Sequence, residues 1–310
     1  MAAHVHRPVL LHEVVEGLAL RPGGLVVDAT LGLAGHAAAL LDSEPTLRLL
    51  GLDVDPDAIA LARSRLLRFG ERARVEHASY WDLEVVLRRL GIAGVDGVLF
   101  DFGVSSLQLD DGARGFSFRH DAPLDMRFSR DGVTAAELIR DASELDLARM
   151  LRDFGEEPRA RRVARAIASA RRRTPIRTTN ELHHVVLHAL GGRRGAIDPA
   201  TRTFQALRIA VNRELDGIAP AIEAAARSLL PEGRLAAIAF HSLEDRLVKQ
   251  TLRRLAGRCV CPPGTMFCQC APENTLEILT PRPVRAGQDE VMDNPRSRSA
   301  RLRLARRKRP

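Results

Sequence analysis

The sequence predicts an α/β fold in which a parallel, doubly wound sheet is interrupted by a helical insertion. Between residues 23 and 101, short apolar runs alternate with stretches of helical periodicity. Strands separated by helices of this length form parallel sheets that are covered by helices. From 134 to 230 the pattern is almost wholly helical, and a strand pattern returns only at 233–242. We therefore expect the sheet to be assembled from two separate parts of the chain.

Each predicted strand in the first part is a short apolar run that ends in polar residues. The four runs are "GLVVDAT" (24–30), "LRLLGLDVD" (47–55), "ARVEHAS" (73–79) and "VDGVLFD" (95–101). Helical stretches follow the first three runs, at 36–42, 57–69 and 81–90. Pro56 directly after Asp55 is typical of a helix start, because the first turn of a helix leaves its amide hydrogens unpaired and proline has none.

The remaining elements predict an inserted helical domain and a return of the chain to the sheet. Helical stretches occupy 134–155, 157–173, 178–190, 201–215 and 217–230, followed by a strand at 233–242, a helix at 243–255 and strands at 275–280 and 299–307. We therefore expect a discontinuous Rossmann-like domain at 1–109 and 217–310, and an inserted helical domain at 110–216.

The composition is that of a soluble globular protein, with 45% hydrophobic and 28% charged residues in a chain of 310. No apolar run approaches the roughly 18–20 residues that span a bilayer. His12 and Glu13 interrupt the apolar run near the amino terminus, which makes it a poor signal peptide. We therefore expect a cytoplasmic protein without a membrane segment.

The net charge of +8 indicates a polyanionic partner. Two segments, 159–173 and 296–309, carry seven and eight basic residues respectively and no acidic residue. Clusters of this kind suit a phosphate-binding surface. A solvated helix and a charged tail are the alternative.

All four cysteines lie in one short segment, "CVCPPGTMFCQC" (259–270). Stable disulfides are rare in the cytosol, and clustered thiols there are more typical of metal binding. Cys259, Cys261, Cys268 and Cys270 supply enough sulfur for a tetrahedral zinc site. Each C-x-C pair is tighter than the usual C-x2-C, so free thiols in an ordered loop are the alternative.

Polar residues at the strand ends outline a candidate cofactor site. The turn at 32–35 contains two glycines but lacks the G-x-G-x-x-G spacing of dinucleotide-binding folds. Asp53 ends the second strand, where an acceptor for a ribose hydroxyl is expected. With Asp28 and Tyr80, these residues favour the adenosine of S-adenosylmethionine, although Tyr80 can equally belong to the core.

Asp101 ends the fourth strand, at the position that faces the transferred group in such folds. Many amine methyltransferases have a D/N-P-P-Y-type segment there, whose acid or amide binds the target amine. Here the segment reads Asp101-Phe102-Gly103-Val104, so the acid is present and the prolines are not. Asp101 is a candidate acceptor for the amine, and a contact with the cofactor alone is the alternative.

Six segments, spread along nearly the whole chain, are distinctive: "HRPVLLHE" (6–13), "DATLGLAGH" (28–36), "DFGVSSLQLDDGARGFSFRHDAPLDMR" (101–127), "TRTFQALRIAVNREL" (201–215), "FHSLEDR" (240–246) and "NPRSRSARLR" (294–303). In these segments the sequence resembles a known family, the bacterial 16S rRNA (cytosine-N4) methyltransferases of the RsmH/MraW family. The resemblance implies a class I Rossmann-like, S-adenosylmethionine-dependent methyltransferase domain with an inserted all-helical domain. It also implies methylation of the N4 amine of one cytidine in the decoding region of the small ribosomal subunit.

The resemblance also implies specific contacts with the cofactor. They fall at Ala34, Gly35, His36, Asp53, Tyr80, Asp101 and Gln108. Two positions depart from the family's pattern, because Ala34 replaces a frequent glycine and Tyr80 replaces a frequent phenylalanine. The added methyl group of Ala34 disfavours a positive φ and can alter a backbone contact there. The four-cysteine segment is not shared by all members.

A base inside an RNA structure must leave its stack before its amine can be methylated. Phe102, Phe116 and Phe118 are candidates for stacking on the extruded cytosine, or else anchors of the loop. Further candidates for contacts with the RNA are Arg114, Arg119, Arg127 and His241. The expected partner is 16S rRNA in the small ribosomal subunit, and a homodimer is left open. A methyltransferase for another exocyclic amine and a non-catalytic ribosome-assembly factor are the alternative functions.

Overall fold

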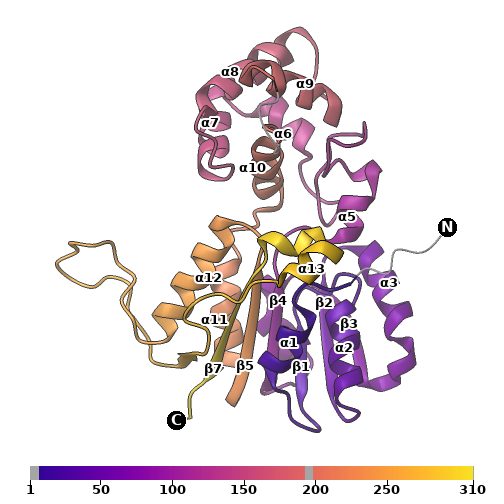
Figure 1. Cartoon of the computed structure of the whole chain (residues 1–310), viewed down its shortest axis with the longest axis vertical. Helices are drawn as coiled ribbons and strands as arrows, with labels where there is room; N and C mark the ends of the chain where they lie inside the picture. Colours follow the sequence, from indigo (N-terminus) through magenta and orange to yellow (C-terminus); the bar gives the residue numbers. More distant parts are fainter. Residues whose placement is uncertain (1–6, 193–197, 310) are drawn as a thin grey trace. The chain divides into compact units, whose positions relative to one another are not determined.

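The computed structural model of the chain describes residues 7–192 and 198–309, without the side chains of Ser106 and Asp110. Its residues divide into two compact units (Figure 1). The sheet unit contains the residues up to Gly103 together with those from Leu215 onward, and the helical unit is Val104–Glu214. In the described residues, the sheet unit has two hydrophobic cores, one on each face of its sheet, and the helical unit has a third.

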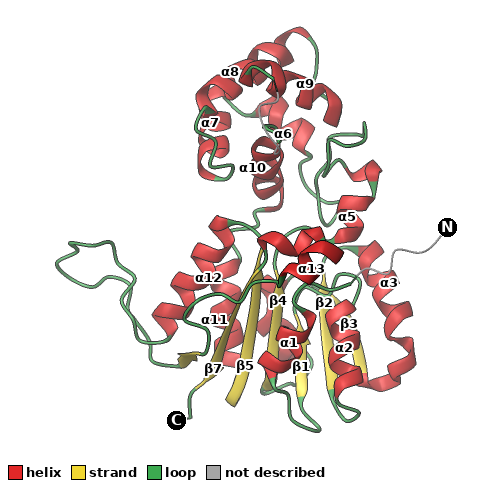
Figure 2. Ribbon diagram, viewed as in Figure 1, coloured by secondary structure: helices red, strands yellow, loops and turns green. Residues whose placement is uncertain are grey.

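The sheet unit is built on a mixed sheet of seven strands in its described part (Figure 2). The strands are β1 (Leu25–Asp28), β2 (Arg48–Asp53), β3 (Ala73–His77), β4 (Val95–Asp101), β5 (Leu229–Ala239), β6 (Leu276–Ile278) and β7 (Arg301–Arg307). Their order is β3-β2-β1-β4-β5-β7-β6. The strands β1 to β5 pair with one another in parallel, whereas β7 is antiparallel to β5 and β6. The predicted doubly wound α/β sheet is confirmed.

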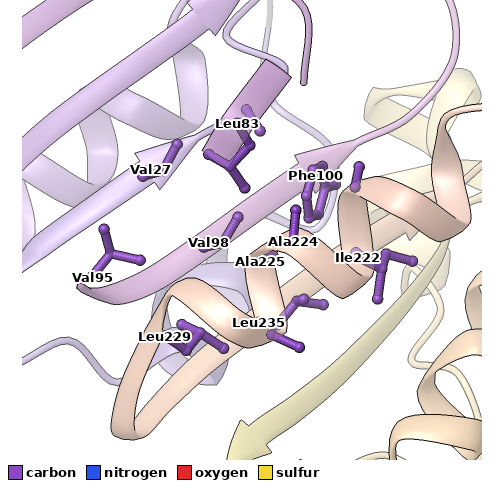
Figure 3. Close-up of a cluster of buried hydrophobic side chains, with 14 of the residues drawn as sticks. Val27, Leu83, Val95, Val98, Phe100, Ile222, Ala224, Ala225, Leu229 and Leu235 are labelled. Atoms are coloured by element: carbon purple, nitrogen blue, oxygen red, sulfur yellow. The ribbon is translucent and has the colours of Figure 1, made fainter. Parts of the chain in front are cut away.

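Both faces of the sheet are covered by helices. One face packs against α1 (Leu11–Leu18), α2 (Gly35–Ser43) and α3 (Pro56–Leu66), and the other against α4 (Leu83–Arg89), α11 (Ile218–Ser228) and α12 (Ser242–Leu255). Alternating side chains of a strand point to opposite faces. Val27 and Phe100 therefore point into the core beneath α4, α11 and α12 (Figure 3). Their neighbours Val26 and Leu99 point into the core beneath α1, α2 and α3.

Several short elements of the sheet unit were not predicted. They are α1, the 3-10 helix η4 (Pro295–Ser299) and the helix α13 (Gln288–Asp293). The 3-10 helices η1 (Leu67–Arg72) and η2 (Tyr80–Asp82) overlap the predicted helices at 57–69 and 81–90. The predicted helix at 81–90 is divided between η2 and α4, because Ser79 caps a separate 3-10 turn by accepting a hydrogen bond from the Trp81 amide.

The helical unit has only helices as its regular elements in the described residues. They are α5 (Ser106–Asp110), η3 (Gly112–Arg114), α6 (Ala135–Asp141), α7 (Glu144–Asp153), α8 (Ala160–Arg173), α9 (Thr179–Leu190) and α10 (Thr201–Asn212). The single stretch predicted at 134–155 is two helices, because Ser143 caps α7 by accepting a hydrogen bond from the amide of Asp146. No helix in the described parts of the chain is long and apolar enough to cross a membrane.

Candidate functional site

The order of the strands reverses between β1 and β4. The chain runs outward from β1 through β2 to β3 and then returns to β4, on the other side of β1. In sheets of this kind, ligands bind beyond the carboxyl ends of the strands at the point of reversal. The strands at this point end in Asp28, Asp53 and Asp101. Three carboxylates are thus gathered at the place where the fold offers a binding site.

The turn after β1 is tied to the end of β2 through Asp53. The amide of Gly32 donates to Asp53 Oδ2 at 2.7 Å, and the amide of Asp55 donates to Oδ1 at 2.9 Å. Gly32 adopts a φ of 51°, in the left-handed region that glycine occupies without a steric penalty. Each oxygen of Asp53 keeps a second lone pair, so a further hydroxyl donor can still be accepted.

Two residues at the start of α2 have unusual backbone requirements, Ala34 in its φ angle and Gly35 in its packing. Ala34 is fully buried with a φ of 57°, a left-handed conformation that costs a non-glycine residue on the order of 1 kcal/mol. A larger residue in place of Gly35 would clash, because its Cβ would lie 2.4 Å from the Cγ of Pro8. The departure from glycine at Ala34 therefore falls at a strained position, and Gly35 is required by close packing.

Asp101 has one carboxylate oxygen that nothing in the described structure satisfies. Its Oδ1 is buried and has no hydrogen-bond partner, although 26% of the side chain is exposed. Its Oδ2 lies 3.7 Å from Nδ1 of His36. The amide of Asp101 donates to the hydroxyl of Thr30 at 2.6 Å, which joins the ends of β1 and β4. The backbone is thus fixed, while a buried acceptor faces the site.

His36 is held from the other side of its ring. Its Nε2 lies 2.9 Å from the carbonyl oxygen of Val9, so this nitrogen is the donor. Nδ1 of the same ring lies 3.7 Å from Oδ2 of Asp101, so His36 lies between the segment before α1 and the end of β4.

The strand-end carboxylates have raised pKa values. Burial raises the pKa of Asp101 well above its usual range, and the charges of Asp28 and Glu244 raise it further. Burial also raises the pKa of Asp28 to about 7, against the lowering effect of the Thr30 amide. The pKa of Asp53 is raised mainly by burial, with its backbone donors opposing. This cluster of acids favours a cationic ligand, because a nearby positive charge restores the ionised forms.

Tyr80, which follows β3, and Phe102, which follows β4, pack against each other. The Tyr80 ring meets that of Phe102 edge-on at a centroid distance of 5.6 Å. Phe100 stacks on Phe102 at 5.2 Å with nearly parallel rings. Only 3% of Phe102 is exposed. In this conformation Phe102 is a core residue, and Tyr80 is the partly exposed member of the group.

His241 and Glu244 cap the start of α12. The amide of Glu244 donates to Nδ1 of His241, while the amides of Phe240 and His241 donate to Oε2 of Glu244. The predicted RNA contact His241 thus has a capping role within the sheet unit. Glu244, a fully buried acid that acts on Asp101, was not predicted as a site residue. Its signal is a glutamate three residues after a cap position, in "HSLE".

In the helical unit, Gln108 belongs to a capping box at the start of α5. Its Oε1 accepts a hydrogen bond from the amide of Ser105 at 3.0 Å, and its own amide donates to the Ser105 hydroxyl at 3.2 Å. The side chain is buried. Gln108, predicted as a cofactor contact, is therefore a determinant of the local helix within its own unit.

The predicted base-stacking residues of the helical unit already have aromatic partners. The ring of Phe116 stacks on that of Phe128 at 5.6 Å. Phe118 stacks on His183 at 4.9 Å and meets Phe204 edge-on at 5.0 Å. Both belong to the core of the unit, where Phe116 is buried and Phe118 is partly exposed.

The three arginines predicted to contact the RNA differ in what they already bind. Arg114 is buried and donates to the carbonyl oxygens of Arg127 and Phe128, each at 2.8 Å. Arg127 forms a bidentate pair with Asp125 at 2.7 and 2.8 Å. Arg119 is exposed. Of the three, Arg119 is the one whose side chain lies in solvent.

The two basic segments also differ. On α8, one face is apolar and buried, while Arg161, Arg162 and Arg172 on the other sides are exposed. In β7 most arginines contact acids: Arg303 binds Asp245, Arg306 binds Glu232 and Glu277, and Arg301 binds Asp245. Acids of the sheet unit thus partly balance the arginines of β7, whereas Arg161, Arg162 and Arg172 of α8 are presented to solvent.

Comparison with known proteins decides the family. The family model described as "MraW methylase family" matches residues 3–308. The chain belongs to the MraW methylase family. It is 50% identical over 307 residues to the ribosomal RNA small subunit methyltransferase H of Symbiobacterium thermophilum. The matched residues cover 98% of this chain and 96% of that protein.

Two further relatives are equally similar to this chain. The protein of the same name from Thermomicrobium roseum is 50% identical over 304 residues, covering 97% of this chain and 93% of its own length. The protein of the same name from Geobacter sulfurreducens is 50% identical over 304 residues, covering 97% of this chain and 98% of its own length. The expected fold is confirmed with the family: a class I, Rossmann-like methyltransferase domain with an inserted helical domain.

Proposed function

We propose that this protein transfers the methyl group of S-adenosylmethionine to the N4 amine of a cytidine in the decoding (P-site) region of 16S rRNA. The family and the names of its relatives support rRNA of the small subunit as the substrate. The chemistry at N4 is supported by one observation above the others, the buried Oδ1 of Asp101 without a hydrogen-bond donor. The protein would act in the cytoplasm.

The strand-end site fits the proposed cofactor. S-adenosylmethionine, when bound, supplies an activated methyl group on a positively charged sulfonium. The desolvated acids Asp28, Asp101 and Glu244 form an environment in which a cation is favoured. Asp53 would accept a ribose hydroxyl, and Gly32 and Gly35 allow close approach of the backbone. Ala34, His36, Tyr80 and Gln108 complete the proposed contacts.

Asp101 would act on the target amine. The N4 nitrogen of cytosine is a weak nucleophile because its lone pair is delocalised into the ring. An acceptor for one of its N–H groups favours the pyramidal nitrogen that carries positive charge in the transition state. A carboxylate is purely an acceptor, and no donor in the part of the chain that the structure describes hydrogen-bonds to Oδ1 of Asp101. The methylated amine then loses its proton to water, so no strong general base is needed.

The helical unit would recognise the substrate RNA. It presents exposed arginines on α8 and the exposed Arg119, which suit contacts with phosphates. Phe118 is the partly exposed candidate for stacking on a base. Phe116, Arg114 and Arg127 would support that surface from inside the unit.

The experiment that tests this function offers several substrates to the full chain. Purified protein and methyl-labelled S-adenosylmethionine are incubated with small subunits from cells lacking the modification, with naked 16S rRNA and with double-stranded DNA. Labelled nucleosides are then identified by digestion and mass spectrometry. We expect N4-methylcytidine at one position of 16S rRNA.

Other outcomes separate the alternatives. Label in DNA, or on an amine other than that of cytidine, contradicts the proposed substrate. Stable binding to the small subunit without transfer of label indicates an assembly factor. Asp101→Ala serves as the control for contaminating activities, since the variant should keep its fold and lose the transfer.

A further inference from the structure

The loop between α12 and β6 has no hydrophobic core of its own. From Gly257 to Thr275 every residue is exposed or only half-buried. Met266 and Phe267, at its far end, are 90% and 80% exposed. Figure 1 shows this loop projecting away from α11 and α12. A segment without buried apolar residues usually depends on a disulfide or a metal ion for a defined conformation.

The four cysteine sulfurs of the chain lie together in this loop. All four Sγ atoms are within 4.8 Å of one another. The distance from Cys268 to Cys259 is 3.6 Å and to Cys270 is 3.4 Å, and that from Cys270 to Cys259 is 3.7 Å. Four sulfurs at about 2.3 Å from a zinc ion, in a tetrahedron, lie about 3.8 Å apart. The observed spacing therefore matches an S4 site around one ion.

Backbone amides support the sulfurs in a reciprocal arrangement. Val260, between Cys259 and Cys261, donates its amide to the sulfur of Cys270 at 3.3 Å. Gln269, between Cys268 and Cys270, donates its amide to the sulfur of Cys261 at 3.3 Å. Hydrogen bonds of this kind stabilise thiolates and orient them as ligands. Each C-x-C turn thus prepares a sulfur of the other turn for a metal.

We propose that Cys259, Cys261, Cys268 and Cys270 bind one structural zinc ion that holds the loop between α12 and β6 in a single conformation. Thiolate ligands select zinc over magnesium or calcium, which prefer oxygen. Four protein ligands leave no open position for water, so the ion is structural. The 14 residues of α12 separate this loop from the strand-end site by a helix about 21 Å long.

The test begins with the metal content of the full chain. Protein purified without affinity tags or chelators should contain about one zinc ion per chain by mass spectrometry of the elements. Cys261→Ser and Cys270→Ser should each lose most of the metal. Phe267→Ala, in the same loop and without a ligand atom, should keep it. Replacement by Co²⁺ should give the visible absorption and sulfur-to-metal charge-transfer bands of a tetrahedral thiolate site.

A second measurement on the unaltered protein avoids the question of whether the variants fold. Because the chain has four cysteines in all, a mercurial reagent titrates only this site. Zinc should be released in step with the thiols, and the loop should become sensitive to protease. Reduced protein that binds neither Zn²⁺ nor Co²⁺ overturns the proposal. Intramolecular disulfides found by mass in anaerobically purified protein overturn it as well.

Discussion

Residues 101–128 are rich in polar and aromatic side chains and are divided between the two units after Gly103. The two parts differ in whether their buried polar groups have hydrogen-bond partners. At the end of β4, in the sheet unit, Asp101 keeps a buried oxygen to which no donor among the described residues hydrogen-bonds. In the helical unit, Arg114 and Phe116 have their partners inside the unit. A buried polar group without a partner costs free energy that folding alone does not recover. The unsatisfied group therefore indicates where a ligand acts, whereas the satisfied groups indicate what holds the loop.

The sharpest test of this difference is Asp101→Ala. If Oδ1 accepts the amine, the rate of methyl transfer should fall by about 10²–10³-fold, as with other donors or acceptors that act in the transition state. Binding of the cofactor is measured separately by calorimetry. Asp96→Ala, at the amino end of the same strand, is the matched control and should keep the rate. Unchanged turnover in Asp101→Ala with normal cofactor binding would exclude Asp101 as the acceptor.

Arg114→Ala tests the other side of the comparison. The substitution removes the buried guanidinium that donates to the carbonyl oxygens of Arg127 and Phe128, which should lower the free energy of unfolding by about 1–3 kcal/mol. Urea denaturation measures the change. The exposed Arg119→Ala should stay within about 0.5 kcal/mol of the unaltered protein. Equal stability of the two variants would show that Arg114 does not hold the loop.

Replacing the exposed arginines Arg161, Arg162 and Arg172 of α8 with glutamine should weaken binding to 16S rRNA. The slope of log K against log salt should fall by about one for each RNA phosphate that an arginine no longer neutralises. The matched control is the triple replacement of Arg140, Arg149 and Arg152, which removes the same charge but from arginines paired with aspartates. If both triple variants bind 16S rRNA with the same reduced affinity, α8 acts only through net charge.

Glu244→Gln should have the smallest effect, on the pH dependence of the reaction. Methyl transfer should rise with pH as Asp101 ionises. The charge of Glu244 raises the pKa of Asp101, so its removal should move the rise toward lower pH. Glutamine keeps the acceptor for the amides of Phe240 and His241. A profile that moves to higher pH, or does not move, contradicts this coupling.

The basic segments show how far charge can be read from sequence. Both lack acids in the sequence, yet β7 pairs with acids from other elements, such as Glu277 in β6 and Asp245 in α12. An antiparallel neighbour places residues opposite one another that are far apart in the chain. No local pattern predicts this. The helical period of α8, in contrast, predicts which arginines face away from its apolar side.

The sequence by itself determined the alternation of strands and helices, the helical insertion and the acids that end β1, β2 and β4. These features depend on local periodicity and on the polarity of strand ends. Only the tertiary structure decided which side chains remain unsatisfied. It buried Phe102 against Phe100, engaged Arg114 with backbone carbonyls and left Oδ1 of Asp101 without a donor from residues 7–192 and 198–309. Burial and hydrogen-bond partners arise from contacts between distant residues, which residue type and spacing do not specify.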